Sequence, residues 1–364
     1  MNTLVPLLWL CGPSGVGKSA VGWEIYSRLT NAAFIDADQL GLCYPSLADD
    51  PYNHRLKARN LGAVWPFVRA AGAQSVILAG GIEVSEQIGL YAGHVPDAAL
   101  TVCRLRAGQN TLHDRFVRRG WMPQLVAEAV AEADDLDRLN FGDLCIDTEG
   151  LCVAEVAQLV RDTTGGWPKP TLSTPPTTIP AVCDDPVPIL LLCGPIAVGK
   201  STVGYEVFTR VRAEAKAAYV DLAQIGFCRP APADDPYHHR LRAANLAAMW
   251  PAFRDAGARC LIVSGRVNDP AALGAYADAF PAANLTACRL DASRDTLTER
   301  ILRRGRGEGP TIPGDDLKGR PAAELYRVAE QPQHSTLGDW PVGTDGRSVE
   351  DIAEQIAAKM LTKL

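Results

Sequence analysis

The feature that most constrains the fold of this chain is a long internal repeat. Residues 43–69 and residues 228–254 lie 185 positions apart and are identical at 17 of 27 positions. The same offset relates Asp36 to Asp221 and Cys103 to Cys288, so about 85 residues align without a gap. Solenoid repeats have periods of only about 20 to 50 residues. The long period therefore predicts a tandem duplication of a whole domain, which makes the chain a pseudo-dimer of two halves.

The length and one segment of unusual composition predict where the two domains lie. A chain of 364 residues is longer than one ordinary core serves. Residues 165–188 are rich in Pro, Thr and Gly and lack apolar periodicity, which is typical of an extended, semi-rigid linker. We therefore expect a first copy at residues 1–164, a linker at 165–188 and a second copy at 189–364.

Each copy alternates apolar strand patterns with helical patterns. In the first copy we expect strands at residues 6–12, 32–38, 74–81, 98–107 and 144–148. Helices are expected at residues 18–29, 52–71, 111–120 and 153–161. Continuous apolar runs that alternate with helices indicate a parallel sheet covered on both faces. The predicted fold is α/β, with two tandem domains that each contain a five-stranded parallel sheet.

Composition and charge disfavour several classes of partner. The ten cysteines form no CxxC pair and lie mostly in apolar runs, so we expect buried, reduced thiols and a cytoplasmic protein. No apolar run approaches the roughly 18 residues that a membrane span requires. Residues 1–165 carry a net charge of −6 and residues 188–364 one of +1. Neither copy has the broad basic surface that a nucleic-acid backbone requires, so a nucleic-acid partner is not expected.

A glycine-rich phosphate-binding motif occurs once in each copy. "GPSGVGKS" at residues 12–19 and "GPIAVGKS" at residues 194–201 both fit GxxxxGK[ST], and each lies between a strand pattern and a helix pattern. The backbone N–H groups of such a loop bind phosphate oxygens, its lysine reaches the β- and γ-phosphates, and its serine binds Mg²⁺. We therefore expect ATP and Mg²⁺ as cofactors. The predicted nucleotide-binding residues are Gly12, Ser14, Gly15, Val16, Gly17, Lys18, Ser19, Ala20, Gly194, Ala197, Val198, Gly199, Lys200, Ser201 and Thr202.

Acidic residues follow the second predicted strand of each copy. Asp36 and Asp38 are spaced i, i+2 and share a face if the strand continues. One carboxylate can hold Mg²⁺, together with Ser19, while the other aligns the acceptor hydroxyl or accepts its proton. The second copy keeps Asp221, beside Ser201, but has Ala223 in place of the second acid. The alternative interpretation is a surface acid that caps the next helix.

These motifs resemble those of the small P-loop kinases, such as shikimate and gluconate kinases, chloramphenicol phosphotransferase and nucleoside-monophosphate kinases. "VILAGGI" at residues 76–82 is similar to the strand and glycine turn that line their acceptor pocket, and "LHDRFVRRG" at residues 112–120 to their arginine-bearing lid. The resemblance implies that Asp36 lies on the magnesium side and that Asp38 and Asp221 face acceptor or metal. It also implies acceptor-pocket glycines at Gly80 and Gly81 and phosphate-neutralising arginines at Arg115, Arg118 and Arg119.

The second copy departs from this pattern beyond Ala223. Arg266 replaces the second glycine of the turn, and the lid segment is richer in arginine, with Arg303, Arg304, Arg306 and Arg320. For the lid arginines of both copies, the alternative interpretation is a solvated helix face.

The repeat is closest at "ADDPYNHRL" (residues 48–56) and "ADDPYHHRL" (residues 233–241). Asp50 followed by Pro51 predicts an N-cap with proline at the first helical position. Arg55, like Arg240, could grip an acceptor carboxylate or phosphate; the alternative is an ion pair with Asp49 or Asp50.

Three further positions of the same helix, His54, Asn60 and Trp65, recur in the second copy. Asn60 and Asn245 are assigned to the acceptor site, although a structural hydrogen bond is an equal alternative for Asn60 and for His54. Trp65 and Trp250 are expected in the core.

Together these features predict a Mg²⁺-dependent phosphotransferase that uses ATP. Its acceptor would be a small molecule with a hydroxyl or phosphate, and the first copy would be the catalytic half. Lys18, Asp36, Asp38, Arg115 and Arg119 would then be the catalytic residues. Two alternatives remain: a nucleoside or nucleotide kinase, and an ATP-binding regulatory protein with little turnover.

Overall fold

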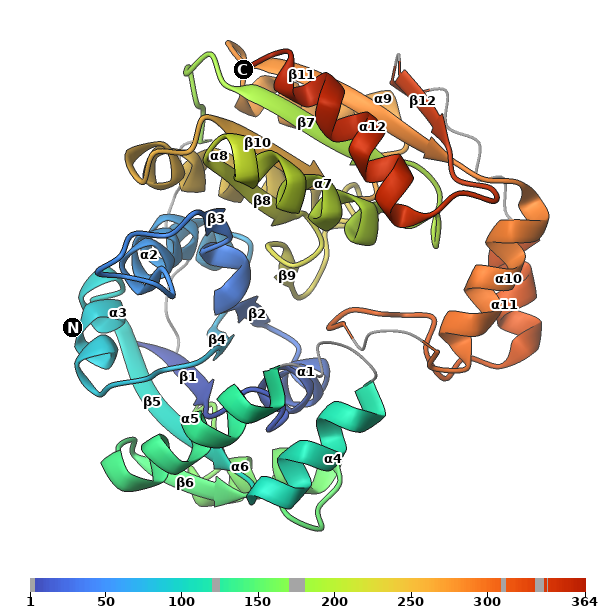
Figure 1. Cartoon of the computed structure of the whole chain (residues 1–364). Coiled ribbons are helices and arrows are strands. Elements are labelled where there is room, and N and C mark those ends of the chain that lie inside the picture. The colour runs from blue at the N-terminus through green and yellow to red at the C-terminus, as the bar shows by residue number, and fades with distance from the viewer. Residues whose placement is uncertain (1–3, 120–124, 170–180, 309–311, 331–336, 339) are drawn as a thin grey trace. The chain divides into compact units, whose positions relative to one another are not determined.

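The computed structural model describes residues 4–119, 125–169, 181–308, 312–330, 337–338 and 340–364. It divides into two compact units, each built around one sheet with helices (Figure 1). Unit 1 comprises Met1–Asp38, Lys57–Thr178 and Phe227–His238, and unit 2 comprises Gln39–Leu56, Ile179–Gly226 and His239–Leu364. The predicted α/β class and the two tandem domains are confirmed. No described helix is long and apolar enough to cross a membrane.

Unit 1 contains the five strands that the first copy predicts. Parallel strands follow the order β6-β5-β1-β4-β2, with β1 in the centre. The strands are β1 (Val5–Cys11), β2 (Ala32–Asp36), β4 (Ser75–Ala79), β5 (Ala98–Arg106) and β6 (Leu144–Asp147). The helices are α1 (Lys18–Ser27), α3 (Glu86–His94), α4 (Gln109–Arg119), α5 (Val126–Leu139) and α6 (Val153–Thr163), together with most of α2 (His54–Ala70).

Unit 2 repeats this arrangement, with parallel strands in the order β12-β11-β7-β10-β8. The strands are β7 (Pro188–Cys193), β8 (Ala217–Asp221), β10 (Cys260–Ser264), β11 (Asn284–Asp291) and β12 (Trp340–Gly343). The helices are α7 (Lys200–Glu214), α8 (His239–Asp255), α9 (Pro270–Ala279), α10 (Arg294–Gly305), α11 (Ala322–Glu330) and α12 (Val349–Leu361). In both units the carboxyl ends of the parallel strands lie at one edge of the sheet, which is where open α/β sheets bind ligands.

Each sheet has a sixth, antiparallel strand, so the prediction of five strands was wrong by one. The sixth strand of unit 1 is β9 (Phe227–Cys228), from the second copy, and it pairs with β2. The sixth strand of unit 2 is β3 (Cys43–Tyr44), from the first copy, and it pairs with β8. The two copies therefore exchange the segment that follows their second parallel strand. A two-residue strand has no periodicity to detect, and its partner lies in the other copy.

Side chains of the exchanged segment complete the packing of unit 1. The ring of Phe227 lies 4.7 Å from Trp23 and 6.1 Å from Phe34, measured between ring centroids. Arg229 lies over the Tyr26 ring and donates a 2.8 Å hydrogen bond to the Ser27 carbonyl. These contacts cover the apolar side of α1 and the edge of β2.

The corresponding contacts in unit 2 come from Tyr44. Its ring lies 6.3 Å from that of Phe208, and the guanidinium of Arg212 lies over it at 5.3 Å. The two segments thus occupy equivalent places in the two units, although the residues that make the contacts differ, since Tyr44 aligns with Arg229.

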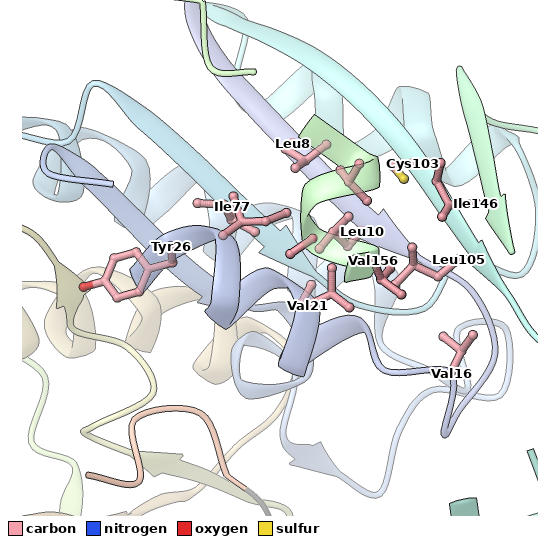
Figure 2. Packing of buried hydrophobic residues seen from close by; sticks show 14 of the residues in the cluster. Leu8, Leu10, Val16, Val21, Tyr26, Ile77, Cys103, Leu105, Ile146 and Val156 are labelled. Carbon is pink, nitrogen blue, oxygen red and sulfur yellow. The ribbon is translucent and has the colours of Figure 1, made fainter. Parts of the chain in front are cut away.

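The core of unit 1 lies between the sheet and helices α1 and α6 (Figure 2). Leu8 and Leu10 from β1 pack with Val21 from α1, Ile77 from β4 and Val156 from α6. Every residue of β1 is buried, as expected for a central parallel strand with both faces covered.

All ten cysteines are unpaired, and eight of them are buried.

Both ends of the predicted linker are attached to a unit. At one end, Trp167 is buried in the unit 1 core. At the other end, Asp185 accepts hydrogen bonds from Trp250 and Arg254. Residues 170–180 of that segment lie outside the described residues.

Helix α2 begins two residues later than predicted. It starts at His54 rather than Tyr52, so Pro51 precedes the helix and does not occupy its first position. The carboxylate of Asp50 still caps the helix, because it accepts hydrogen bonds from the backbone N–H groups of His54 at 2.7 Å and Arg55 at 3.0 Å. The capping role was therefore correct and its register was wrong.

Candidate functional site

The glycine-rich loop of each copy joins the central strand of its sheet to the following helix. In unit 1, Gly12, Gly15 and Gly17 all have positive φ angles, of 127°, 83° and 110°. A Cβ atom on Gly12 would lie 2.2 Å from the Leu105 carbonyl oxygen, so a side chain cannot be accommodated there. The loop of unit 2 has the same form, with Ala197 at φ 61° in place of Gly15. This backbone turns N–H groups inward, as phosphate binding requires.

The loop lysines donate hydrogen bonds to backbone carbonyl groups of their own loops. Lys18 Nζ donates to the Gly12 oxygen at 2.8 Å and to the Pro13 oxygen at 3.0 Å. Lys200 Nζ donates to Gly194 at 3.0 Å and to Pro195 at 2.7 Å. Both ammonium groups are thus held at the mouth of the loop by neutral acceptors that a phosphate oxygen can replace.

A serine–aspartate pair stands beside the loop in both units. Ser19 Oγ donates to Asp36 Oδ2 at 3.2 Å, and Ser201 Oγ donates to Asp221 Oδ2 at 2.5 Å. A hydroxyl and a carboxylate at this separation are the hard oxygen ligands that Mg²⁺ prefers. The residues predicted as metal ligands are therefore brought together, and they fit the ion.

The first copy adds a second carboxylate next to this pair. Burial, together with the nearby Asp38 carboxylate, raises the pKa of Asp36 to about 6. Asp38 is 62% exposed and accepts a 2.8 Å hydrogen bond from Lys57 Nζ, whose side chain is only 10% exposed. The Asp38 carboxylate is therefore open to solvent and is held by a buried cation.

Lys57 is a site residue that the sequence analysis missed. It lies 19 positions after Asp38, on the helix that follows the exchanged segment, and no motif marks it. The second copy has Arg242 at this position and lacks the acid, with Ala223 in its place. Both positions differ between the copies, and this joint change is the signal that could have revealed the pair.

The second copy concentrates positive charge around its loop. Burial, helped by the positive charges of Arg266 and Arg304 and opposed by Asp221, lowers the pKa of Lys200 to about 8. A cavity of about 360 Å³ opens here, lined by the loop, by α10 and by Thr344 and Arg347 from the segment after β12. Its size and lining suit an anionic ligand as large as a nucleotide.

Arg115 makes contacts other than those expected of a side chain that neutralises phosphate. Its guanidinium donates to the Val16 carbonyl at 2.7 Å, to Thr148 Oγ1 at 3.0 Å and to the Thr148 carbonyl at 3.1 Å. Arg300 makes the same three kinds of contact with Val198 and Thr344. Both arginines thus join the phosphate loop to the segment after the last strand.

The remaining lid arginines divide into two groups. The side chains of Arg118 and Arg119 lie outside the described residues. Arg303 and Arg306 pair with Glu308, Arg320 pairs with Asp316, and Arg304 pairs with Asp315 at 3.0 Å. Arg304 also acts electrostatically on Lys200, so it is the member of this group nearest to the loop chemistry.

The two glycines after β4 differ in what they face. A Cβ atom on Gly80 would lie 2.5 Å from the Ala37 Cβ, so this glycine is required by close packing. A Cβ atom on Gly81 would lie 3.6 Å from Glu83 Oε1 and 3.8 Å from Glu132 Oε1. Gly81 therefore borders a group of carboxylates rather than an apolar wall.

The two arginines of the repeated nonapeptide, Arg55 and Arg240, fall in the same unit. Arg55 belongs to unit 2, whereas Lys18 and Asp38 belong to unit 1. Its side chain is 50% exposed and pairs with Asp49 at 2.7 Å, which was the alternative interpretation. Arg240 belongs to unit 2, together with Asp221.

The asparagines assigned to the acceptor site are buried. Asn60 is fully buried, and Asn245 donates a 2.6 Å hydrogen bond to the Ile225 carbonyl. For Asn245 this is the structural hydrogen bond that was the alternative for its counterpart Asn60. Trp65 and Trp250 are buried as expected and donate to Asp97 and Asp185.

No family model matches the sequence, and no curated protein matches it. Solved structures do match, each over slightly less than half of the chain. The tunicamycin resistance protein of Deinococcus radiodurans is 22% identical, with a TM-score of 0.37, over 47% of this chain and 99% of its own. Shikimate kinase from Acinetobacter baumannii, in complex with shikimate, is 17% identical, with a TM-score of 0.33, over 46% and 97%. APS kinase CysC from Mycobacterium tuberculosis, in complex with AMPPNP and APS, is 23% identical, with a TM-score of 0.33, over 44% and 98%.

Each match covers nearly the whole of the known chain and under half of this one. At TM-scores this low the likeness carries no argument about activity or substrate, which depend on the chain's own residues.

Proposed function

We propose that the chain is a Mg²⁺-dependent phosphotransferase that moves the γ-phosphoryl group of ATP to a small-molecule hydroxyl or phosphate, and that the first copy is the catalytic half. One observation carries this proposal. Around the Lys18 loop, the Ser19–Asp36 pair stands beside a solvent-exposed carboxylate, Asp38, that Lys57 holds at 2.8 Å. A protein that only bound ATP would not require this second, fixed carboxylate.

The residues of the first copy have separate roles in this proposal. Lys18 leaves the loop carbonyls and binds the β- and γ-phosphates. Ser19 and Asp36 would hold Mg²⁺, which neutralises phosphate charge when bound. Asp38 aligns the acceptor hydroxyl and receives its proton, and Lys57 keeps that carboxylate in place. Positioning and charge neutralisation make up most of phosphoryl-transfer catalysis, so this small set is sufficient.

The second copy is assigned nucleotide binding with impaired acceptor chemistry. It has the loop, Lys200 and the Ser201–Asp221 pair, but Ala223 offers no carboxylate.

The ten unpaired cysteines support a reducing compartment, and we propose that the protein acts in the cytoplasm.

Turnover by variants of the full chain tests this assignment. With MgATP and a panel of sugars, shikimate-like acids, aminoglycoside-type and nucleoside acceptors, Lys18→Ala is expected to abolish product formation and Lys200→Ala to retain it. Asp38→Ala is expected to lower turnover at least about a hundredfold while ATP still binds. Loss of turnover in Lys200→Ala alone would contradict the assignment to the first copy. Tight ATP binding without any phosphorylated product would favour the regulatory alternative.

A further inference from the structure

A carboxylate of unit 1 occupies part of the phosphate loop itself. Glu132, on α5, accepts a 3.0 Å hydrogen bond at Oε2 from the backbone N–H of Ser14, the third residue of the loop motif. Its charge also interacts favourably with Lys18 and unfavourably with Glu83 and Asp38. An anionic oxygen thus lies where the loop presents an amide to a phosphate oxygen.

Helix α5 is anchored so that Glu132 faces the loop. Ala129, Ala133 and Leu136 are buried on one side of the helix. Arg104 donates to Asp137 at 2.5 Å, and Gln109 donates to both oxygens of Asp134 at 3.0 and 3.1 Å. Because buried side chains and the hydrogen bonds of Asp134 and Asp137 hold the helix in place, the contact between Glu132 and the loop is a feature of the folded unit.

The second copy cannot make this contact. The offset of 196 positions that relates Thr148 to Thr344 also relates the buried Ala129 and Ala133 to the buried Leu325 and Ala329. It places Val328 opposite Glu132, and the loop alignment places Ile196 opposite Ser14.

Val328 and Ile196 both pack against one apolar cluster, formed by Ile301, Leu317, Leu325 and Ala329. A valine side chain has no acceptor for the loop amide.

We propose that Glu132 is an internal competitor for the nucleotide phosphates at the first copy and thereby gates that site. The proposal rests on the proposed function, because it assigns ATP to both loops. A phosphate oxygen and the Glu132 carboxylate cannot both accept from the Ser14 amide, and their negative charges repel one another. Nucleotide therefore binds the first copy only when Glu132 leaves the loop, which lowers its affinity there.

Calorimetric titration of the full chain tests the gate at the first copy. Lys200→Ala removes nucleotide binding at the second copy, and Glu132→Gln is added in that background. The expected result is about tenfold tighter binding of MgATP and of inorganic pyrophosphate. The substitution removes the repulsion between the Glu132 carboxylate and the phosphate, and it weakens the hydrogen bond that competes for the Ser14 amide. Adenosine, which has no phosphate, is expected to bind equally with and without the substitution. Glu128→Gln, an exposed carboxylate one turn earlier on α5, is the matched control and is expected to change nothing.

The outcomes separate the gate from the proposed function. Unchanged MgATP and pyrophosphate affinity in Glu132→Gln, with normal ATP binding at the second copy in Lys18→Ala, would overturn the gate alone. Equal gains for adenosine and pyrophosphate would overturn it too, because they would indicate a general loosening of the site. Absence of ATP binding at both copies in every variant would overturn the proposed function and the gate together. If Glu132→Gln binds MgATP and pyrophosphate more tightly but adenosine equally, and no variant forms a phosphorylated product, the gate is supported and the phosphotransferase assignment is wrong.

Discussion

Lys57 Nζ lies 2.8 Å from Asp38 Oδ1, and this ion pair joins a helix residue to the acid that follows β2 within unit 1. The lysine side chain is 10% exposed and the aspartate 62% exposed. The pair is therefore asymmetric, with the cation built into the protein and the carboxylate presented to solvent. In the second copy the two positions hold Arg242 and Ala223, so the acid is absent while a cation remains.

The first prediction concerns this pair. Lys57→Met keeps the apolar stem but removes the charge that positions Asp38, so kcat is expected to fall about tenfold or more while the Kd for MgATP stays the same. Lys57→Arg is expected to retain most of the activity, because it keeps a donor at the same place. Steady-state kinetics and calorimetry on the two variants make the comparison. An equal loss of ATP affinity in Lys57→Met would show that the lysine supports the loop rather than the acceptor side.

The second prediction concerns Arg115, which links the phosphate loop to the segment after β6. Arg115→Ala removes three hydrogen bonds, at 2.7 to 3.1 Å, from Val16 and Thr148. We expect a loss of about 2–4 kcal/mol in the free energy of unfolding of unit 1 and at least about tenfold weaker ATP binding at the first copy. The measurements are denaturant unfolding and titration in the Lys200→Ala background.

Arg115→Lys serves as the discriminating variant. A lysine keeps the charge but lacks the planar fork that reaches both groups of Thr148, so it is expected not to restore ATP binding. The exposed neighbour Asp114 provides the control, and Asp114→Ala is expected to leave both quantities unchanged. Wild-type ATP affinity in Arg115→Lys would contradict the role of the fork.

Much of the fold could be predicted because its signals are local or repeated. The apolar runs of β1, β2, β4, β5 and β6 are long enough to be recognised as strands. The glycine pattern of the loop also fixes the place of Lys18 and Ser19, and the strand that ends at Asp36 brings that acid to the same edge of the sheet.

What could not be predicted depends on contacts between segments that are far apart in sequence. The exchanged strands have two residues each, and their pairing is decided by partners about 175 or 195 residues away in the other copy. Lys57 and Glu132 carry no motif, and only the packing of α2 and α5 brings them to Asp38 and Ser14. The contacts of the arginines could not be predicted for the same reason, because charge alone does not reveal which side chains form ion pairs within the protein.

The third prediction concerns Asp36 and pH. The pKa of this carboxyl is raised from 3.8 to about 6 in the folded protein, mainly by burial. The folded state therefore binds the proton more tightly than the unfolded state. The stability that this protonation contributes is present below pH 3.8 and is lost as the pH rises to about 6. Above pH 6 the ionised carboxylate destabilises the protein when no metal is bound.

Asp36→Asn tests this assignment directly. Without nucleotide or Mg²⁺, the variant is expected to be more stable than the wild type by about 1–3 kcal/mol at pH 8, and the advantage is expected to shrink towards pH 4. With MgATP present, the order is expected to reverse, because only the carboxylate binds the metal well. Urea unfolding at several pH values, with Glu128→Gln as an exposed control, gives the comparison. A variant that is less stable than the wild type at pH 8 without ligand would contradict the assignment.

The last prediction concerns the exchange of segments between the copies. Phe227 belongs to the second copy by sequence, yet it packs on Trp23 and Phe34 and extends the sheet at β2. Phe227→Ala is therefore expected to destabilise unit 1 by about 2–3 kcal/mol, through lost apolar burial and aromatic contacts. In hydrogen exchange measured by mass spectrometry, residues 32–36 of the first copy should exchange faster, while the equivalent strand β8 should be unaffected. Tyr44→Ala is the reciprocal variant and should accelerate exchange in β8 but not in β2. Faster exchange confined to the copy that carries the substitution would show that each copy keeps its own segment in solution, and the exchanged topology would then be wrong.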